Sequence, residues 1–187
     1  MAAVIKMTLS KASIIAAKKA LRAYKKTIWK QQCEEFVSRL ADKGIAVAEA
    51  HAGHWGPYLR FSKQISPKRW GAKAVMSGAY TQLVERRWKV IEGGKEVIKS
   101  AYVNPLLMAE FGSGKYAVSN KYAKRHGAGR GTFPGQTHAW NDSGWSWLTE
   151  DDKWMHSSGE QPSMPMFTAY EEMMRDVMNV ARQVFGT

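Results

Sequence analysis

The sequence predicts an α+β fold with a long N-terminal helix, a small antiparallel β-sheet that includes a hairpin, and a C-terminal amphipathic helix packed on the sheet. Near both ends of the chain, apolar residues recur every three or four positions, as on one face of a helix. Between these segments, short apolar runs are divided by Gly, Pro and Ser, which is typical of strands and turns. The length of 187 residues suits one core, so we predict a single domain over residues 1–187.

The first predicted helix covers residues 10–43, which contain neither Gly nor Pro. Apolar residues from Ile14 to Leu40 follow the helical period. The opposite face is basic, and no acidic residue precedes Glu34. Its cationic residues are Lys11, Lys18, Lys19, Arg22, Lys25, Lys26 and Lys30.

Residues 45–114 are predicted to form the β-sheet region. The candidate strands cover residues 45–49, 58–62, 73–79, 83–91 and 96–102. The segment Glu-Gly-Gly-Lys at 92–95 predicts a tight hairpin turn, because glycine accepts the positive φ that such turns require. Loose alternation along 83–91 predicts one polar, cationic face and one covered face. We expect residues 109–114 to be the end of a strand that turns sharply at Gly112.

Residues 115–160 are predicted to be a Gly/Trp-rich inserted loop, since glycines and basic residues dominate its first part. We expect the stretch 112–144 to be a long mobile loop, because it lacks the apolar surface that would order it. The C-terminal helix is assigned to residues 163–187 and begins near Pro165, whose fixed φ suits the first helical position. Its apolar stripe is interpreted as core, with part of its methionine-rich flank available to a partner.

The formal net charge of +12 is distributed unevenly. Residues 1–135 hold 25 Lys and Arg against 8 Asp and Glu, whereas residues 136–187 hold 3 against 8. Three interpretations stay open: a surface for nucleic-acid phosphates, copies of the chain that dock through complementary charge, or an ordinary solvated face. A membrane-surface helix is disfavoured, because the basic end of residues 10–43 lacks a Trp- and Phe-rich apolar side.

The only cysteine, Cys33, has no partner within the chain, which favours a reducing compartment. The sequence has no apolar stretch of membrane-spanning length and no secretory signal pattern. We therefore expect synthesis and folding in the cytoplasm.

Catalytic and metal-binding patterns are weak. His51 and His54 are three apart, but the glycine between them argues against a helix that would direct both at one metal. The acidic segment 150–152 is interpreted as a solvated turn. His126 and His138 have no acid or nucleophile at a telling spacing. We expect no enzyme activity, no cofactor and no metal.

Five short segments carry a resemblance to a known family. They are Ala-Glu-Phe-Gly-Ser-Gly at 109–114, Gly-Trp-Ser-Trp at 144–147, Asp-Asp-Lys-Trp at 151–154, His-Ser-Ser-Gly at 156–159 and Pro-Ser-Met-Pro-Met-Phe at 162–167. Their order, after a long helix and a small sheet, resembles the siphophage tail-completion proteins, which join the tail to the head. Two departures are a methionine between the usual Pro and Phe, and Ser113 in place of a usual Thr.

The resemblance implies a virion structural protein of the tail or neck, synthesised in the host cytoplasm. It implies a homo-oligomeric ring that contacts head-closure and tail terminator or tube proteins and surrounds a channel for genomic DNA. The residues that match the family motifs are Glu110, Phe111, Gly112, Trp145, Trp147, Gly159, Pro165 and Phe167. Basic residues of the predicted hairpin, or of the first helix, are candidates to line the channel. The hairpin candidates are Arg86, Arg87, Lys89, Lys95 and Lys99.

A different class of protein is the alternative: a free-standing basic nucleic-acid-binding or nuclease domain. The sequence pI of about 9.8 and the presence of both Lys and Trp motivate it. It predicts salt-sensitive DNA binding by the isolated chain, with Trp stacking on single strands. Against it, the tryptophans concentrate in the acidic C-terminal third rather than beside the lysines.

Overall fold

The computed structural model describes residues 10–113, 116, 144–149 and 151–186. These residues form two compact units, and the chain passes between them several times. The first unit contains described residues 10–47, 62–77 and 169–186, and the second contains the rest. The prediction of a single domain stays a prediction, and each unit is described by itself.

Two helices open the first unit. Helix α1 (Lys11–Lys26) begins after Ser10, whose Oγ accepts a hydrogen bond from the Ser13 backbone N–H at 3.1 Å. A break at Thr27 separates it from α2 (Ile28–Ala50). The predicted long N-terminal helix is therefore confirmed, with one interruption and a later end than residue 43.

The predicted strand at residues 45–49 is wrong, because α2 continues through Gly44 to Ala50. Gly44 is buried, and a Cβ placed there would lie 2.6 Å from the sulfur of Met173 and 2.9 Å from that of Met76. The glycine thus lets two methionines pack closely against the helix. This tertiary contact outweighs the low helix propensity from which the strand prediction followed.

Helix α2 has a strand pair on one side. Strands β1 (Leu59–Lys68) and β2 (Gly71–Tyr80) form a two-stranded sheet and extend the strands predicted at 58–62 and 73–79. Lys63 of β1 fixes this sheet to α2, since its Nζ donates to Ser38 Oγ at 2.7 Å and pairs with Asp42 at 2.5 Å.

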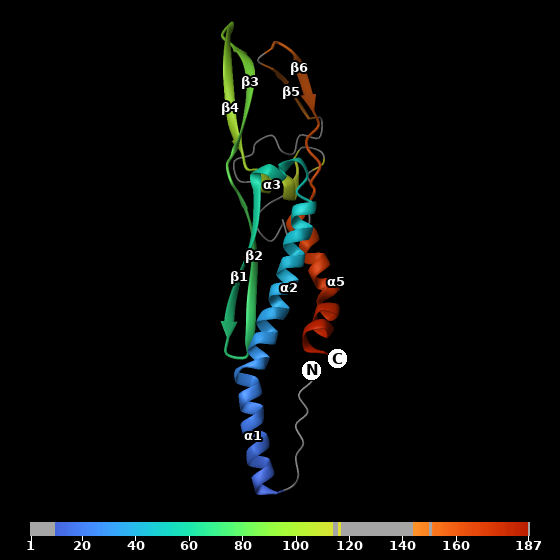
Figure 1. Cartoon of the computed structure of the whole chain (residues 1–187). Coiled ribbons are helices and arrows are strands. Elements are labelled where there is room, and N and C mark those ends of the chain that lie inside the picture. Colours follow the sequence, from blue (N-terminus) through green and yellow to red (C-terminus); the bar gives the residue numbers. More distant parts are fainter. Residues whose placement is uncertain (1–9, 114–115, 117–143, 150, 187) are drawn as a thin grey trace. The chain divides into compact units, whose positions relative to one another are not determined.

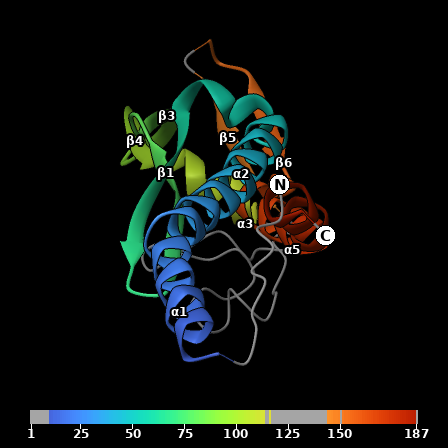
Figure 2. The ribbon, with the colours of Figure 1, turned by 60° about the horizontal axis from the view of Figure 1, so that its bottom comes forward.

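Helix α5 (Pro165–Phe185) runs along α2 on the side away from the strand pair (Figure 1 and Figure 2). The Phe185 ring lies 5.5 Å from the Trp29 ring and 5.6 Å from the Phe36 ring, measured between centroids. An ion pair of 2.6 Å joins Lys43 to Asp176 and lowers the pKa of the Asp176 carboxyl. The start of this helix at Pro165 agrees with the sequence prediction.

The core of the second unit forms around Trp55. This residue belongs to the 3-10 helix η1 (Gly53–Tyr58) and packs with Leu59, Met108 and Ala109. The last two residues lie on a short helix, α3 (Pro105–Phe111). The expectation of a strand end at 109–114 is therefore wrong. Asn104 caps the helix through Oδ1, which accepts from two backbone N–H groups, and Pro105 occupies the first turn.

A hairpin of β3 (Val84–Glu92) and β4 (Lys95–Val103) belongs to the second unit. It turns at Gly93 and Gly94, whose φ values are +57° and +77°, so the predicted turn and both predicted strands are confirmed. The predicted covered face is wrong for β4, because each of its side chains before Val103 is exposed.

Strands β5 (Trp145–Leu148) and β6 (Trp154–Ser157) extend this sheet, whose order is β4-β3-β5-β6. Both strands lie in the segment predicted as loop, so that prediction is wrong for residues 145–148 and 154–157. Tryptophan at alternating positions suits a strand pair, and this period was missed. Most of the predicted mobile stretch, residues 114–115 and 117–143, lies outside the described residues.

We expect Gly112→Ala to destabilise the protein far more than Gly93→Ala. Both glycines have positive φ, but a Cβ at Gly93 meets open space, whereas one at Gly112 would meet the Glu160 carbonyl oxygen and lie 2.7 Å from Pro162 Cδ. Backbone strain alone costs about 1–2 kcal/mol, and the added overlap should bring the cost for Gly112→Ala to about 3 kcal/mol or more. Urea unfolding followed by Trp fluorescence measures both. Equal losses would contradict the crowding at Gly112.

Candidate functional site

Glu110 joins two of the motif segments. It lies in the last turn of α3, and its carboxylate caps α5: Oε2 accepts from the Met166 N–H at 2.9 Å and Oε1 from the Phe167 N–H at 3.0 Å. The first N–H groups of a helix have no hydrogen-bond partner within it, and the Glu110 carboxylate accepts from two of them. Its negative charge also interacts favourably with the positive end of the helix dipole. Pro165 occupies the first helical position and is fully buried.

The Glu110 side chain is only 7% exposed, and its ionised form loses most of its contact with water. Burial raises the pKa of the Glu110 carboxyl, and the two backbone N–H donors offset part of this shift. The residue is thus a buried acid held by hydrogen bonds rather than a free general base.

Backbone hydrogen bonds connect the same two segments. The N–H of Ser113 donates to the Glu160 carbonyl at 2.8 Å, and the N–H of Glu160 donates to the Ser113 carbonyl at 3.2 Å. The N–H groups of Ser163 and Met164 both donate to the Ala109 carbonyl, at 2.9 and 3.0 Å. Residues 109–113 and 159–167 therefore form one connected structure, which we call the motif clasp.

A side-chain contact ties the motif clasp to η1. Trp55 Nε1 donates a hydrogen bond to Glu160 Oε1, and His54 Nε2 lies 3.2 Å from the same oxygen. The imidazole is largely exposed, whereas the indole is buried. Sequence analysis missed both Trp55 and Glu160, because 105 residues separate them. This contact ties residue 160 to the core of the second unit.

The structure brings most of the motif residues together, but not all. Glu110, Gly112, Pro165 and Phe167 take part in the motif clasp, and Phe111 is buried within it. The Gly159 N–H donates to Ser157 Oγ at 3.0 Å, next to the end of β6. Trp145 and Trp147 lie on β5, opposite Ser157 and Met155 of β6, and their side chains are outside the described part of the structure.

The hairpin residues proposed to line a DNA channel are largely paired with acids. Lys89 is 9% exposed and forms ion pairs with Asp152 at 2.5 Å and Glu96 at 3.2 Å. Hydrogen bonds to Asp152 and then to Glu96 raise the pKa of the Lys89 ammonium. A lysine held in this way has its charge compensated inside the fold.

Two further cations of the hairpin are also compensated. Arg87 pairs with Glu85 at 2.8 Å and lowers the pKa of that carboxyl, and Lys99 pairs with Glu92. Arg86 lies with its guanidinium carbon 5.7 Å from the centre of the Trp55 ring, and Lys95 is exposed beside the turn. A role of these five residues in contacting DNA stays a prediction, and the ion pairs of three of them weaken it.

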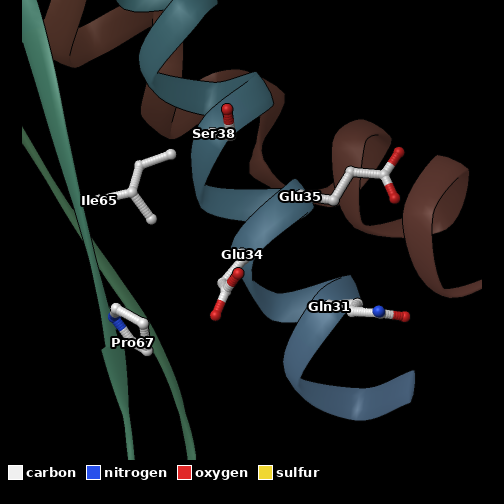
Figure 3. A pocket seen from close by; sticks show the side chains of 6 residues that line it. All are labelled: Gln31, Glu34, Glu35, Ser38, Ile65 and Pro67. Atoms are coloured by element: carbon white, nitrogen blue, oxygen red, sulfur yellow. The ribbon is translucent and has the colours of Figure 1, made fainter. Parts of the chain in front are cut away.

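An open hollow of about 500 Å³ lies between α2 and β1 in the first unit. Figure 3 shows the side chains of Ile65 and Pro67 on the strand side and four polar side chains on the helix. Those are Gln31, Glu34, Glu35 and Ser38. Glu35 already pairs with Arg39 at 2.6 Å, and the Ser38 hydroxyl accepts from Lys63. Lys63, which holds the Ser38 hydroxyl, also pairs with Asp42.

Within the described ranges, no three His, Cys, Asp or Glu side chains gather as a metal site. No helix in that part of the chain is both long enough and apolar enough to cross a bilayer. Comparisons with models of protein families, with curated proteins and with solved structures find no match to this chain.

We expect Glu110→Gln to change how the stability of the protein depends on pH. Because burial raises the pKa of Glu110 in the folded state, the folded protein binds this proton more tightly than the unfolded chain does. Its contribution to the free energy of unfolding is therefore largest at low pH and falls as pH rises past the ordinary carboxyl pKa towards the raised one. The variant does not lose stability in this way, so its stability relative to the native protein should rise as the pH rises from the ordinary carboxyl pKa of about 4.3.

Urea unfolding over this pH range measures the difference. Glu171→Gln removes an exposed carboxyl of the same helix and serves as the matched control for the loss of one negative charge. A relative stability of Glu110→Gln that falls with pH would show that the two N–H donors outweigh the cost of burial.

Proposed function

We propose that this chain is a bacteriophage structural protein that completes the tail and joins it to the head, as a ring around the DNA channel. The observation that carries the proposal is the β3–β4 hairpin, which exposes apolar side chains along its length. Exposed fractions are 67% for Ile91, 57% for Ile98 and 67% for Tyr102. Large apolar side chains grouped on a surface mark contacts with other proteins.

The position of β4 supports the same conclusion. It is the edge strand of its sheet, nine residues long, and its outer backbone groups are not paired within the described sheet. A long, exposed edge strand favours pairing with another chain unless it is protected. In a ring, a neighbouring copy or a tail protein would cover this edge and the side chains beside it.

Helix α5 carries a second exposed apolar line. Tyr170, Met174 and Met178 follow one another at intervals of four, and each is more than half exposed. The apolar stripe of the C-terminal helix, which the sequence predicts to be core, is therefore partly exposed to solvent. Methionine side chains adapt to varied surfaces, which suits contacts that form during assembly.

The motif clasp also supports the proposal. Two of the five segments on which the resemblance to tail-completion proteins rests, residues 109–114 and 162–167, are far apart along the chain, yet they meet through backbone and side-chain hydrogen bonds. Segments that form one structural unit are expected to be kept together in a family. We propose that the protein acts by binding, in the tail or neck of the virion, to head-closure and tail terminator or tube proteins.

The basic face of α1 favours a second candidate function, that of a free-standing nucleic-acid-binding or nuclease domain. It would bind DNA without a ring and without other virion proteins. The two functions differ in what loss of the protein does to phage particles.

We expect deletion of the gene from the phage or prophage that encodes it to yield filled heads beside unattached tails, seen by electron microscopy. A native copy supplied in trans should restore joined particles, whereas Ile98→Asp should not, because it places a charge on the exposed apolar surface. Ser77→Asp adds the same charge at an exposed position of β2 and serves as the control, with joining retained. Normal infectious virions after deletion would overturn the proposed function.

A further inference from the structure

The basic residues of α1 form one continuous stripe. With 3.6 residues per helical turn, Lys18, Arg22 and Lys25 lie along one line, and Lys19 and Lys26 lie along a second line beside it. All five side chains are exposed. The helix therefore presents its cations on one side rather than spreading them around its circumference.

Nothing in the described structure neutralises this stripe. None of its five side chains forms an ion pair with a described carboxylate, and the first acidic residue, Glu34, follows Lys26 by two helical turns. Like charges at a spacing of four residues repel each other, so the row destabilises the isolated helix. A polyanion would relieve this repulsion. The hairpin differs, because most of its cations already face acids.

The turn between β1 and β2 extends the stripe at the end of α1. Lys25 Nζ lies 3.4 Å from the centre of the Trp70 ring, and the Arg69 guanidinium carbon lies 5.0 Å from it. The Trp70 carbonyl accepts a hydrogen bond of 3.1 Å from Trp29 Nε1 on α2. These contacts hold Lys68 and Arg69, both exposed, beside the last turn of α1. Trp70 itself is 58% exposed.

We propose that the stripe on α1 and residues 68–70 together bind the phosphate backbone of duplex DNA, without reading bases. Lysine and arginine on a helix surface, with no fixed geometry for base edges, give non-specific and salt-dependent affinity. This proposal rests on the proposed function for its role in the virion. Of the two groups of basic residues that were candidates to line the channel, those of α1 rather than those of the hairpin contact the DNA.

The arrangement of α1 favours DNA over a lipid surface. A helix that lies in a membrane surface presents a wide polar face opposite a wide apolar one. In α1, cations flank the apolar line of Ile14 and Leu21 on one side only, and the other side holds the uncharged residues Ser13, Ala20 and Tyr24. A one-sided cationic stripe suits the flank of a rod-shaped polyanion.

The test is the binding of the full-length protein to a labelled duplex of about 30 base pairs and arbitrary sequence, measured by fluorescence anisotropy over a series of salt concentrations. One variant carries Lys18→Gln, Arg22→Gln and Lys26→Gln. The control carries Arg86→Gln, Lys95→Gln and Lys99→Gln on the hairpin and so loses the same net charge. Circular dichroism establishes that both variants keep the native helix content.

We expect the α1 variant to bind at least about tenfold more weakly at 0.1 M salt, with a log–log salt slope smaller by about 2 to 3, since each phosphate contact contributes about 0.9. The hairpin variant should stay within about twofold of the native protein. Equal losses in both variants would overturn the assignment to α1, as would the absence of binding by the native protein. Tighter binding to single-stranded than to duplex DNA would overturn the proposal that the ligand is a duplex. Equally tight binding to vesicles containing phosphatidylglycerol would overturn DNA as the ligand in favour of a lipid surface.

The proposed function can fail separately. If deletion leaves normal virions while the α1 variant loses DNA binding, the assignment stands and the tail-joining function falls. If heads and tails stay apart after deletion while no DNA binding is measured, the function stands and the assignment falls.

Discussion

The cap that Glu110 provides to α5 is the constraint on which the second unit depends. A buried carboxylate is costly unless it is paired or hydrogen-bonded, and here two backbone N–H groups at the start of a helix are its donors. To place the carboxylate there, α3 must end within one residue of Glu110, and the chain must turn so that residues 159–167 run beside it. Gly112 permits that turn, because its positive φ and missing Cβ let the Glu160 carbonyl approach.

This constraint explains what the motif residues do in the structure, which their order along the chain does not reveal. Pro165 occupies the first helical position, where a missing N–H costs nothing, and Ser113 pairs with Glu160 in both directions through the backbone. Trp55 then secures Glu160 from the core side. The motif clasp is therefore a structural support. It fixes the start of α5, while the surfaces that would meet other molecules lie on the hairpin, on the rest of α5 and on α1.

Sequence reasoning succeeded where the signal is local. Gly93 and Gly94 alone determine a hairpin turn, and the spacing of apolar residues determines the long helices. It failed where contacts between residues far apart in the sequence determine the local structure. Helix α2 passes Gly44 because methionines from β2 and α5 pack there, and α3 replaces a strand because its cap and its core contacts act together. The resemblance selected Glu110, but its role as a cap depends on N–H groups 56 residues away.

The same limit explains why net charge is a poor guide to a binding surface. Lys89 and Lys99 of the hairpin pair with acids of the facing strand, and Lys89 also pairs with Asp152. Arg87 pairs with Glu85 of its own strand, so the fold compensates three of the five hairpin cations. A helix offers only its neighbours three and four positions away, and α1 has no acid at any of those positions. Its charge must therefore be met by solvent ions or by another molecule. A cation that is already paired within the fold is less available to neutralise a phosphate and release the counterions bound to the nucleic acid. This is why we propose the row on α1, rather than the paired cations of the hairpin, for contacts with a phosphate backbone.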